Sequence, residues 1–482
     1  MKNNLFIKKD IGAILKNAES GGLKRNLNST HLVMLGVGAI VGTGIFVITG
    51  QAAAMYAGPA LSISFLISAL ACVLAGLCYA EFAAMMPVSG SVYSYCYTAL
   101  GELPAWFVGW TLVMEYLFAC SSVAVGWSGY MTSLFDGWGL HLPAHLSQSM
   151  LDHTTENGWV FTGSFMDFPA VFIVGIVTAF LLGGTKQSAW INNVIVVVKV
   201  AVILLFVGFG LSYVNVDNLT PFVPKNTGEF GSFGWSGVLR GAAVVFYAYL
   251  GFDALSTAAQ EVKNPQKDMP RGILISLLIC AVLYVAVTLV LTGIVPYQQL
   301  NTEAPIAIAV DSVGKLSWLS PFIKIGAIAG ITSVVLVMSL GQSRIYYAIS
   351  RDGLLPKIFS KINKRGAPVN ATLCGGIATA IIAGILPLHV LVELVSIGTM
   401  LAFTIVCISV IILRKTQPLI PRPFKTPWVP FIPLLGAAVC ITQMVALPEA
   451  TWIRLAIWTA IGLTIYFTYG IKHSHLRGRN NS

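Results

Sequence analysis

The chain has 482 residues, of which 56% are hydrophobic and only 10% are charged, and its formal net charge is +10. Soluble domains carry about 25% charged residues, so this composition excludes an ordinary soluble protein and predicts a protein that crosses a membrane many times. A net positive charge of this size could suit nucleic-acid binding, but the positions of the charges argue against it, as described below.

Apolar stretches of about 20 residues, long enough to cross a bilayer as a helix, recur about twelve times. They lie near residues 33–57, 60–86, 105–131, 168–184, 190–213, 237–260, 272–296, 321–348, 369–388, 391–413, 429–447 and 452–470. We therefore expect an all-α membrane protein with about twelve transmembrane helices and no separate soluble domain. The expected divisions are an N-terminal segment (1–30), a core of ten helices (31–413), two further helices (414–470) and a C-terminal tail (471–482).

The lysines and arginines are distributed unevenly between the two sides of the membrane. If the N-terminus is cytoplasmic, 23 of them fall on the cytoplasmic side and 5 on the other side, while Lys199 lies within a span. The positive-inside rule predicts this asymmetry, and an even number of spans places both termini in the cytoplasm. The positive charge therefore sets the orientation, and we predict no nucleic-acid partner.

The first span carries four glycines between residues 36 and 44, although each glycine weakens a helix by about 1 kcal/mol relative to alanine. We expect the helix to open near Gly42, Thr43 and Gly44, because unwound backbone at membrane depth is tolerated where it lines a cavity. The freed N–H groups and the Thr43 hydroxyl would then face that cavity at the start of a new half-helix, a geometry that binds a carboxylate. The alternative is that the glycines only permit close helix packing.

The sixth span is also irregular, because Gly251 and Asp253 interrupt its apolar run. A break at Gly251 would free the carbonyl groups of Tyr247, Ala248 and Leu250 to accept hydrogen bonds from an ammonium group. If spans 1–5 and 6–10 are repeats, the odd number of helices in each makes the two halves inverted, and paired broken helices at matching positions indicate the binding site of a secondary transporter. The two breaks together predict a site for a zwitterion. Asp253 would either take part in coupling or cap the second half-helix.

Two other charged residues lie deep in apolar runs, Glu115 in the third span and Lys199 in the fifth. Lys199 lies about nine residues, or roughly 13 Å, into its span, so its ammonium group reaches the aqueous surface only with strain. A buried lysine that loses and regains a proton is a plausible device for coupling transport to a proton gradient. The alternative is a static ion pair with Glu115 or Asp253.

Several polar groups have weaker interpretations. Glu81, near the cytoplasmic end of the second span, is expected to be a solvated gate or a structural residue. Thr332 and Ser333 could help to bind Na⁺, or they could hydrogen-bond to their own helix; if the Lys199 ammonium group points there, it takes the place of the cation and favours protons over sodium. The loop histidines fit no common metal-ligand spacing, and no deep His/Asp or Cys/His pair occurs in the spans. We therefore predict no metal, no cofactor and no enzyme activity.

Four motifs of this chain resemble those of the amino acid–polyamine–organocation (APC) superfamily, and the similarity runs from about residue 25 to about residue 475. Within that superfamily the chain is most similar to the cationic amino acid transporter group, and especially to its bacterial YfnA-type permeases. The motifs are Gly42-Thr43-Gly44, the loop PVSGSVY at residues 87–93, Gly251-Phe252-Asp253, and Glu261-Val262-Lys263-Asn264-Pro265.

This resemblance implies two inverted five-helix repeats of the LeuT type plus two peripheral helices, discontinuous helices 1 and 6, and transport by alternating access. It implies that Glu115 and Lys199 take part in proton coupling and that Met338, in the eighth span, limits the pocket for the substrate side chain. It also assigns the substrate carboxylate to Thr43 and Gly44, and the substrate amine to the carbonyl groups of Ile40, Tyr247, Ala248 and Leu250. Because a thioether fills space that a long cationic side chain needs, small or neutral amino acids are expected as readily as arginine or lysine.

We accordingly expect a proton-coupled L-amino acid symporter of a bacterial cytoplasmic membrane. Its expected partners are an amino acid, protons and the lipid bilayer, and a small membrane subunit or a homo-oligomer is left open. An amino acid exchanger of the same fold and a transporter-like amino acid sensor are the two alternatives.

Overall fold

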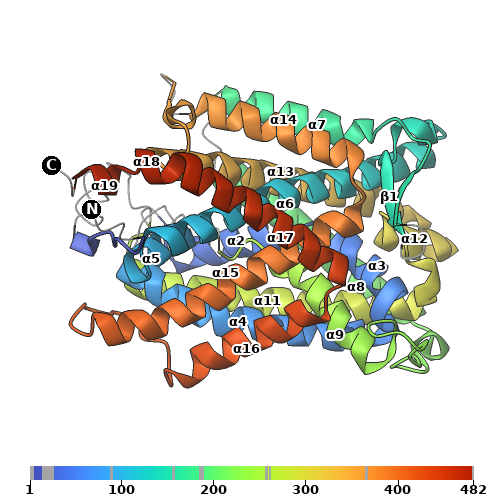
Figure 1. The fold of residues 1–482 in the computed structure, drawn as a ribbon. Coiled ribbons are helices and arrows are strands. Elements are labelled where there is room, and N and C mark those ends of the chain that lie inside the picture. Colours follow the sequence, from blue (N-terminus) through green and yellow to red (C-terminus); the bar gives the residue numbers. More distant parts are fainter. Residues whose placement is uncertain are drawn as a thin grey trace.

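The computed structural model describes residues 5–12, 27–86, 91–154, 158–183, 189–253, 255, 259, 262–363 and 367–479. Within these ranges the chain is mostly helical, and most of the long helices run along one common direction (Figure 1). Parts of two sequence motifs, including Ser89, Gly90 and Glu261, lie outside the described residues.

The helices of the first half are α2 (Ser29–Ile40), α3 (Thr49–Ala52), α4 (Leu61–Met85), α5 (Ser91–Ala99), α6 (Glu102–Gly137), α7 (Phe168–Leu182) and α8 (Ala189–Gly210). Those of the second half are α9 (Gly234–Val245), α11 (Pro265–Ile294), α12 (Pro305–Ser312), α13 (Ser320–Arg351), α14 (Val369–Ile385) and α15 (Leu388–Thr416). They are followed by α16 (Phe431–Ala446), α17 (Glu449–Ile465), α18 (Ile471–His473) and α19 (His475–Arg479).

In the described chain, seven helical segments are long and apolar enough to cross a membrane: Gly44–Met85, Glu102–Gly137, Asn193–Tyr213, Pro265–Ile294, Gly314–Arg351, Leu388–Thr416 and Glu449–Arg477. Four shorter apolar helices, α2, α7, α14 and α16, accompany them. The prediction of a helical membrane protein is therefore confirmed. The number of crossings and the four divisions of the chain stay predictions.

Local chemistry explains where several helices begin and end. The Asn28 side chain accepts a hydrogen bond from the N–H of His31 and so caps α2, and Asp167 caps α7 through the N–H of Ala170. Both bonds satisfy donors that the first turn of a helix leaves without a partner. Pro387 is extended and separates α14 from α15. A proline has no N–H to donate to the preceding turn, and its ring crowds that turn, so α14 ends before it.

A short β-hairpin in the 138–167 connection is the one addition to the all-α prediction within the described residues. Strand β1 (Leu151–Thr154) pairs antiparallel with β2 (Gly158–Phe161), and Leu151 lies opposite Phe161. The residues of β2 include aromatic and β-branched types that favour strands, but the apolar run is too short to be distinguished from other loop segments by sequence alone.

The two terminal segments meet at one end of the bundle (Figure 1). The Lys9 ammonium group lies 2.5 Å from a carboxylate oxygen of Asp352, at the end of α13, and the N–H of His475 donates to the Asp352 carbonyl group at 3.1 Å. Placing both termini on one side agrees with an even number of crossings.

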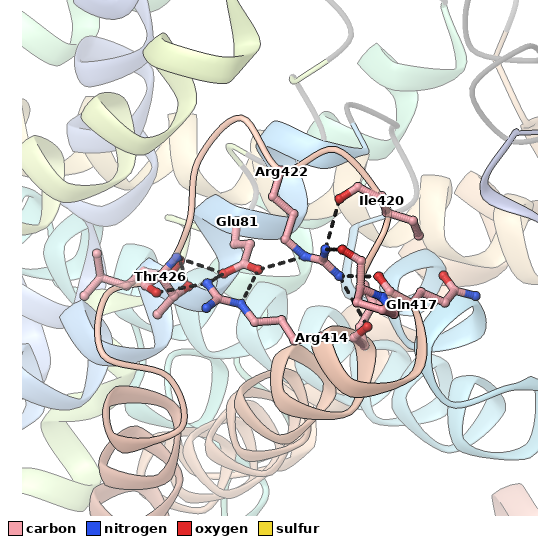
Figure 2. A network of polar contacts seen from close by, with 9 residues as sticks. Glu81, Arg414, Gln417, Ile420, Arg422 and Thr426 are labelled. Atoms are coloured by element: carbon pink, nitrogen blue, oxygen red, sulfur yellow. Dashed lines mark hydrogen bonds and ion pairs between the residues drawn. The ribbon is translucent and has the colours of Figure 1, made fainter.

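A buried ion cluster near this end corrects the expectation that Glu81 is solvated (Figure 2). Glu81 is 3% exposed and accepts two hydrogen bonds from Arg414, at 2.9 and 2.7 Å. It also accepts the N–H of Thr426 at 2.8 Å, and Arg422 lies 3.5 Å away. A two-point arginine to carboxylate contact fixes the geometry of both partners. Glu81 therefore holds the end of α15 and the 417–430 connection against α4, and it has the structural role that was the other possibility.

Candidate functional site

The first span is interrupted at the glycines that predicted the break. Helix α2 ends at Ile40, Val41 is extended, and a π-helical segment starts at Gly44 (Gly44–Ile48). The N–H groups of the first turn of a helix have no partner inside the helix, so the second half-helix directs the N–H groups near Thr43 and Gly44 into the break. This is the arrangement that attracts an anion.

The sixth span is interrupted at the corresponding place. After α9, a 3₁₀ turn covers Phe246–Tyr249, Leu250 is extended, and Gly251 has a φ of +110°. A left-handed φ of this kind strains any residue with a Cβ atom. An Asp253 carboxylate oxygen accepts the N–H of Gly251 at 3.2 Å, within the break itself. Both predicted roles of Asp253, coupling and capping of the second half-helix, stay predictions.

The two breaks lie against each other. A Cβ atom on Gly44 would stand 2.4 Å from the Cα and Cβ atoms of Ala248, and a Cβ atom on Gly251 would stand 2.8 Å from the backbone of Ala39. Ordinary contacts begin near 3.4 Å, so these glycines allow an approach of the two backbones that no other residue permits. Close approach and helix opening are therefore both present, and the two explanations of the first-span glycines are not exclusive.

Tyr284 on α11 ties the two breaks together. Its hydroxyl lies 3.0 Å from the carbonyl oxygen of Ile40 and 2.6 Å from that of Ala248. One hydroxyl has a single proton to donate, so it is shared between carbonyl groups of the two interrupted spans. Sequence reasoning missed Tyr284, because a tyrosine within a long apolar helix gives no signal that separates it from an ordinary core residue.

A small cavity of about 20 Å³, enough for about one water molecule, lies between the breaks. Its lining contains six of the seven predicted substrate-binding residues, namely Ile40, Thr43, Gly44, Tyr247, Leu250 and Met338. The other lining residues are Ala39, Gly42, Ala119, Val123 and Val334. Ala248 is not in the lining, but it contacts Gly44 behind it.

Spacing along the helices could have identified some of the lining residues that sequence reasoning missed. Val334 precedes Met338 by four residues on α13, and Ala119 precedes Val123 by four on α6. Residues four apart share a face of a helix, so Met338 could have indicated Val334. No sequence signal indicated the pair on α6.

The polar groups of the cavity are partly satisfied. The Tyr247 hydroxyl lies 2.8 Å from the Ser122 hydroxyl. The Thr43 hydroxyl is buried beside Tyr247, and it makes no hydrogen bond of ordinary length and angle within the described residues. A buried hydroxyl without a partner carries a desolvation cost, which a ligand with a hydrogen-bonding group would remove.

The carbonyl groups predicted to bind an amine are mostly engaged by one donor each. The Tyr284 hydroxyl contacts the carbonyl groups of Ile40 and Ala248, and the carbonyl group of Tyr247 accepts the N–H of Leu250 at 3.1 Å. Each carbonyl oxygen has two lone pairs, so each of these groups keeps one lone pair for a further donor.

Lys199 contacts the first break directly. Its side chain is fully buried, and its ammonium group donates to the carbonyl group of Gly38 and, at 2.7 Å, to that of Val41. Both carbonyl groups belong to the C-terminal end of α2, where a cation is favoured by the helix dipole. The alternative of a static ion pair with Glu115 or Asp253 is not what the structure contains, because backbone oxygens hold the ammonium group.

Glu115 lies close to Asp253 of the other broken span. Glu115 on α6 is 4% exposed and is close to the Thr399 hydroxyl and to Asp253, and the Tyr116 hydroxyl lies 3.4 Å from Asp253. The three predicted coupling residues therefore divide into Lys199 at the first break and a carboxyl pair beside the second.

The residues considered for sodium have other contacts. Thr332 donates to the carbonyl group of Ile328 and accepts from Trp127, while Ser333 donates to the carbonyl group of Gly330. Gly330 also packs against the Lys199 side chain: a Cβ atom added to Gly330 would stand 3.2 Å from the Cβ atom of Lys199. The Lys199 side chain thus packs against this turn of α13. Across the described residues no cluster of metal-binding side chains occurs.

Comparisons with known proteins identify the family. A family model described as amino acid permease matches residues 27–467. The methylthioribose transporter of Bacillus subtilis is 47% identical over 475 residues, 98% of this chain and 99% of that protein. The branched-chain amino acid permease BcaP of the same organism is 46% identical and covers 99% of this chain and 100% of its own length. Cationic amino acid transporter 4 of Homo sapiens is 30% identical over 94% of this chain and 88% of that protein. With a match over most of its length, the chain belongs to the amino acid permease family of membrane transporters.

Proposed function

We propose that this protein imports neutral L-amino acids with apolar side chains across a bacterial cytoplasmic membrane by proton symport. The observation that carries the substrate class is the cavity between the two breaks, whose lining includes no acidic or basic side chain. A cationic side chain placed there would lose its hydration without gaining a charged partner, which is costly. The relative named as a branched-chain amino acid permease supports the same class.

In the proposed complex, the substrate carboxylate accepts hydrogen bonds from the N–H groups at Thr43 and Gly44 and from the Thr43 hydroxyl. The substrate ammonium group, which has three N–H donors, donates to carbonyl groups among those of Ile40, Tyr247, Ala248 and Leu250. The side chain lies against Val334 and Met338 of α13 and against the alanine and valine of α6 that line the cavity. The present volume of about 20 Å³ is too small for an amino acid, so binding requires the half-helices to move apart, as alternating access demands.

Proton coupling is proposed to act through Lys199. The protonated ammonium group holds two carbonyl groups at the end of α2, and its deprotonation would weaken both bonds and release this half-helix. Glu115 and Asp253, beside the sixth-span break, form a second place where a proton could be held. In this proposal the charged lysine keeps the first break in the arrangement that binds the substrate, and the loss of its proton lets the half-helix move so that the substrate is released.

The proposed orientation has both termini in the cytoplasm, which the distribution of lysine and arginine supports. The proposed partners are an L-amino acid, protons and the surrounding lipid bilayer. The proposed division of the chain is the N-terminal segment, the ten-helix core, the last two membrane helices and the tail, with the boundaries predicted from the sequence.

The test is uptake of labelled leucine into proteoliposomes that contain no internal amino acid. Symport predicts accumulation when the external pH is lower than the internal pH, and its collapse when a protonophore is added. An exchanger takes up leucine only after internal amino acid is supplied, and a sensor binds leucine without flux, so each of these results would reject the symport proposal.

Methylthioribose is a second candidate substrate. The relative with this printed activity is 47% identical along almost the whole chain, and the cavity presents the hydroxyl groups of Thr43 and Tyr247 beside apolar side chains. Unlabelled methylthioribose that blocks leucine uptake more strongly than isoleucine does would favour this candidate. Failure to compete would remove it.

A further inference from the structure

An apolar groove of about 430 Å³ lies on the outside of the bundle, near the end where the two termini meet. Its lining residues are all apolar, and they are Leu100, Leu103, Pro104, Phe107, Ile405, Ile408, Ile412 and Leu463. They come from the residue that follows α5, from the start of α6, from the C-terminal half of α15 and from α17. Ile408 is 39% exposed, so the groove is open toward the surroundings of the protein, which are lipid tails in a membrane helix bundle.

The α15 wall of this groove ends in a cation. Ile405, Ile408, Ile412 and Lys415 follow one another at steps of three and four residues, which places them on one face of the helix. Lys415 lies in the last turn and is exposed. The apolar face therefore leads directly to a positive charge at the level where lipid headgroups begin.

The opposite wall of the groove also ends near a cation. The carbonyl group of Leu5 accepts the N–H of Leu103 at 3.0 Å, and the backbone of Phe6 lies against Gly101. The N-terminal segment thus crosses the mouth of the groove, and two residues later it exposes Lys8. The mouth has one lysine from each side.

The buried carboxylates beside the α6 and α15 walls, Glu102 and Glu81, are paired with arginine side chains. Glu102, the first residue of α6, is fully buried, and its carboxylate accepts hydrogen bonds from Tyr97, Tyr466, Ser474 and Arg477. Residues 414–431 contain four basic residues and no acidic residue, and two of these, Arg414 and Arg422, point toward the buried Glu81.

We propose that this groove binds an acyl chain of an anionic phospholipid, and that Lys8 and Lys415 hold the phosphate of its headgroup. The apolar lining matches the lipid tail, and the two exposed lysines match the negative headgroup, so charge and polarity agree along the whole groove. With the termini in the cytoplasm, the lipid belongs to the cytoplasmic leaflet. This site is separate from the cavity between the broken helices.

The experiment measures the melting temperature of the detergent-purified full chain while phosphatidylglycerol or phosphatidylcholine with identical acyl chains is titrated. Phosphatidylglycerol is expected to stabilise the protein at lower concentration. A lysine near an anionic surface contributes a factor of roughly five in binding, so a protein with both Lys8→Gln and Lys415→Gln should need about 30-fold more phosphatidylglycerol. Lys361→Gln, which removes an exposed lysine on the α13 to α14 connection, is the matched control.

A second variant tests the groove itself. Ile408→Trp fills it and should remove the phosphatidylglycerol effect, whereas Ile457→Trp, at a position on α17 that is 57% exposed and outside the groove, should leave it intact. Equal stabilisation by the two lipids, an unchanged response of the lysine variants, or an unchanged response of Ile408→Trp would each overturn the proposal. So would occupation of the groove by a second copy of the chain, seen as a lipid-independent dimer by native mass spectrometry that Ile408→Trp abolishes.

Discussion

Replacing Lys199 with methionine removes the two hydrogen bonds that its ammonium group makes to the carbonyl groups of Gly38 and Val41. A hydrogen bond to a charged group contributes about 1.5–3 kcal/mol, so the loss of both weakens the arrangement of the first break by about 3–6 kcal/mol. Each 1.4 kcal/mol corresponds to tenfold in an equilibrium constant. We therefore expect leucine binding to weaken by at least 100-fold in Lys199→Met.

A second substitution at Lys199 separates the hydrogen bonds from the proton. Arginine keeps a positive charge and several donors, but it does not release its proton at any physiological pH. Lys199→Arg should therefore keep leucine binding within about tenfold, and it should lose accumulation driven by a pH gradient. The assays are thermal-shift titration with leucine for binding and proteoliposome uptake for accumulation.

The matched control is Lys324→Met, at a buried lysine of α13 that pairs with Asp311 at 3.0 Å, outside the cavity. It should accumulate leucine at a rate close to that of the parent protein. Accumulation by Lys199→Arg at the parent rate, with the same dependence on the pH gradient, would refute the coupling role of Lys199.

Three other predictions follow from the geometry. Met338→Ser enlarges the cavity and should shift competition for uptake toward neutral amino acids with longer side chains; an unchanged profile over the twenty amino acids would mean that the pocket is limited elsewhere. Gly44→Ala would place a methyl group about 1 Å inside ordinary contact with Ala248 and should lower uptake at least tenfold, whereas Gly208→Ala, with open space around it, should be neutral. Burial and repulsion from Asp167 raise the pKa of Glu303, in the connection before α12, to about 8. The folded protein then keeps a proton that the unfolded chain loses above an ordinary pKa of 4.5, so stability should fall as pH rises from about 4.5 to 8. The Glu303→Gln protein should show a smaller fall in melting temperature over this pH range. The same dependence of melting temperature on pH in both proteins would contradict the role of Glu303.

The two helix breaks could be predicted from the sequence because they conflict with local physics. Four glycines in the first span and the Gly251 to Asp253 stretch in the sixth weaken helices that apolar composition otherwise favours. The family resemblance then supplied Met338, which lies in the cavity lining together with residues from both breaks.

Contacts between distant parts of the chain were outside the reach of sequence patterns. The bonds from Arg414 to Glu81 join residues 333 positions apart, and nothing in either segment indicates its partner. The same holds for Tyr284, which joins the two breaks. Burial depth alone suggested that Lys199 could pair with a carboxylate, but the end of a broken helix offers carbonyl groups that satisfy an ammonium group equally well.

The most direct test of the proposed site is competition for leucine uptake in proteoliposomes by all twenty amino acids, at two external pH values. We predict that leucine, isoleucine and valine compete most strongly, that arginine and lysine compete weakly, and that uptake increases at the lower external pH. Strong competition by arginine and lysine, with uptake independent of the pH gradient, would contradict both the neutral cavity and the coupling through Lys199.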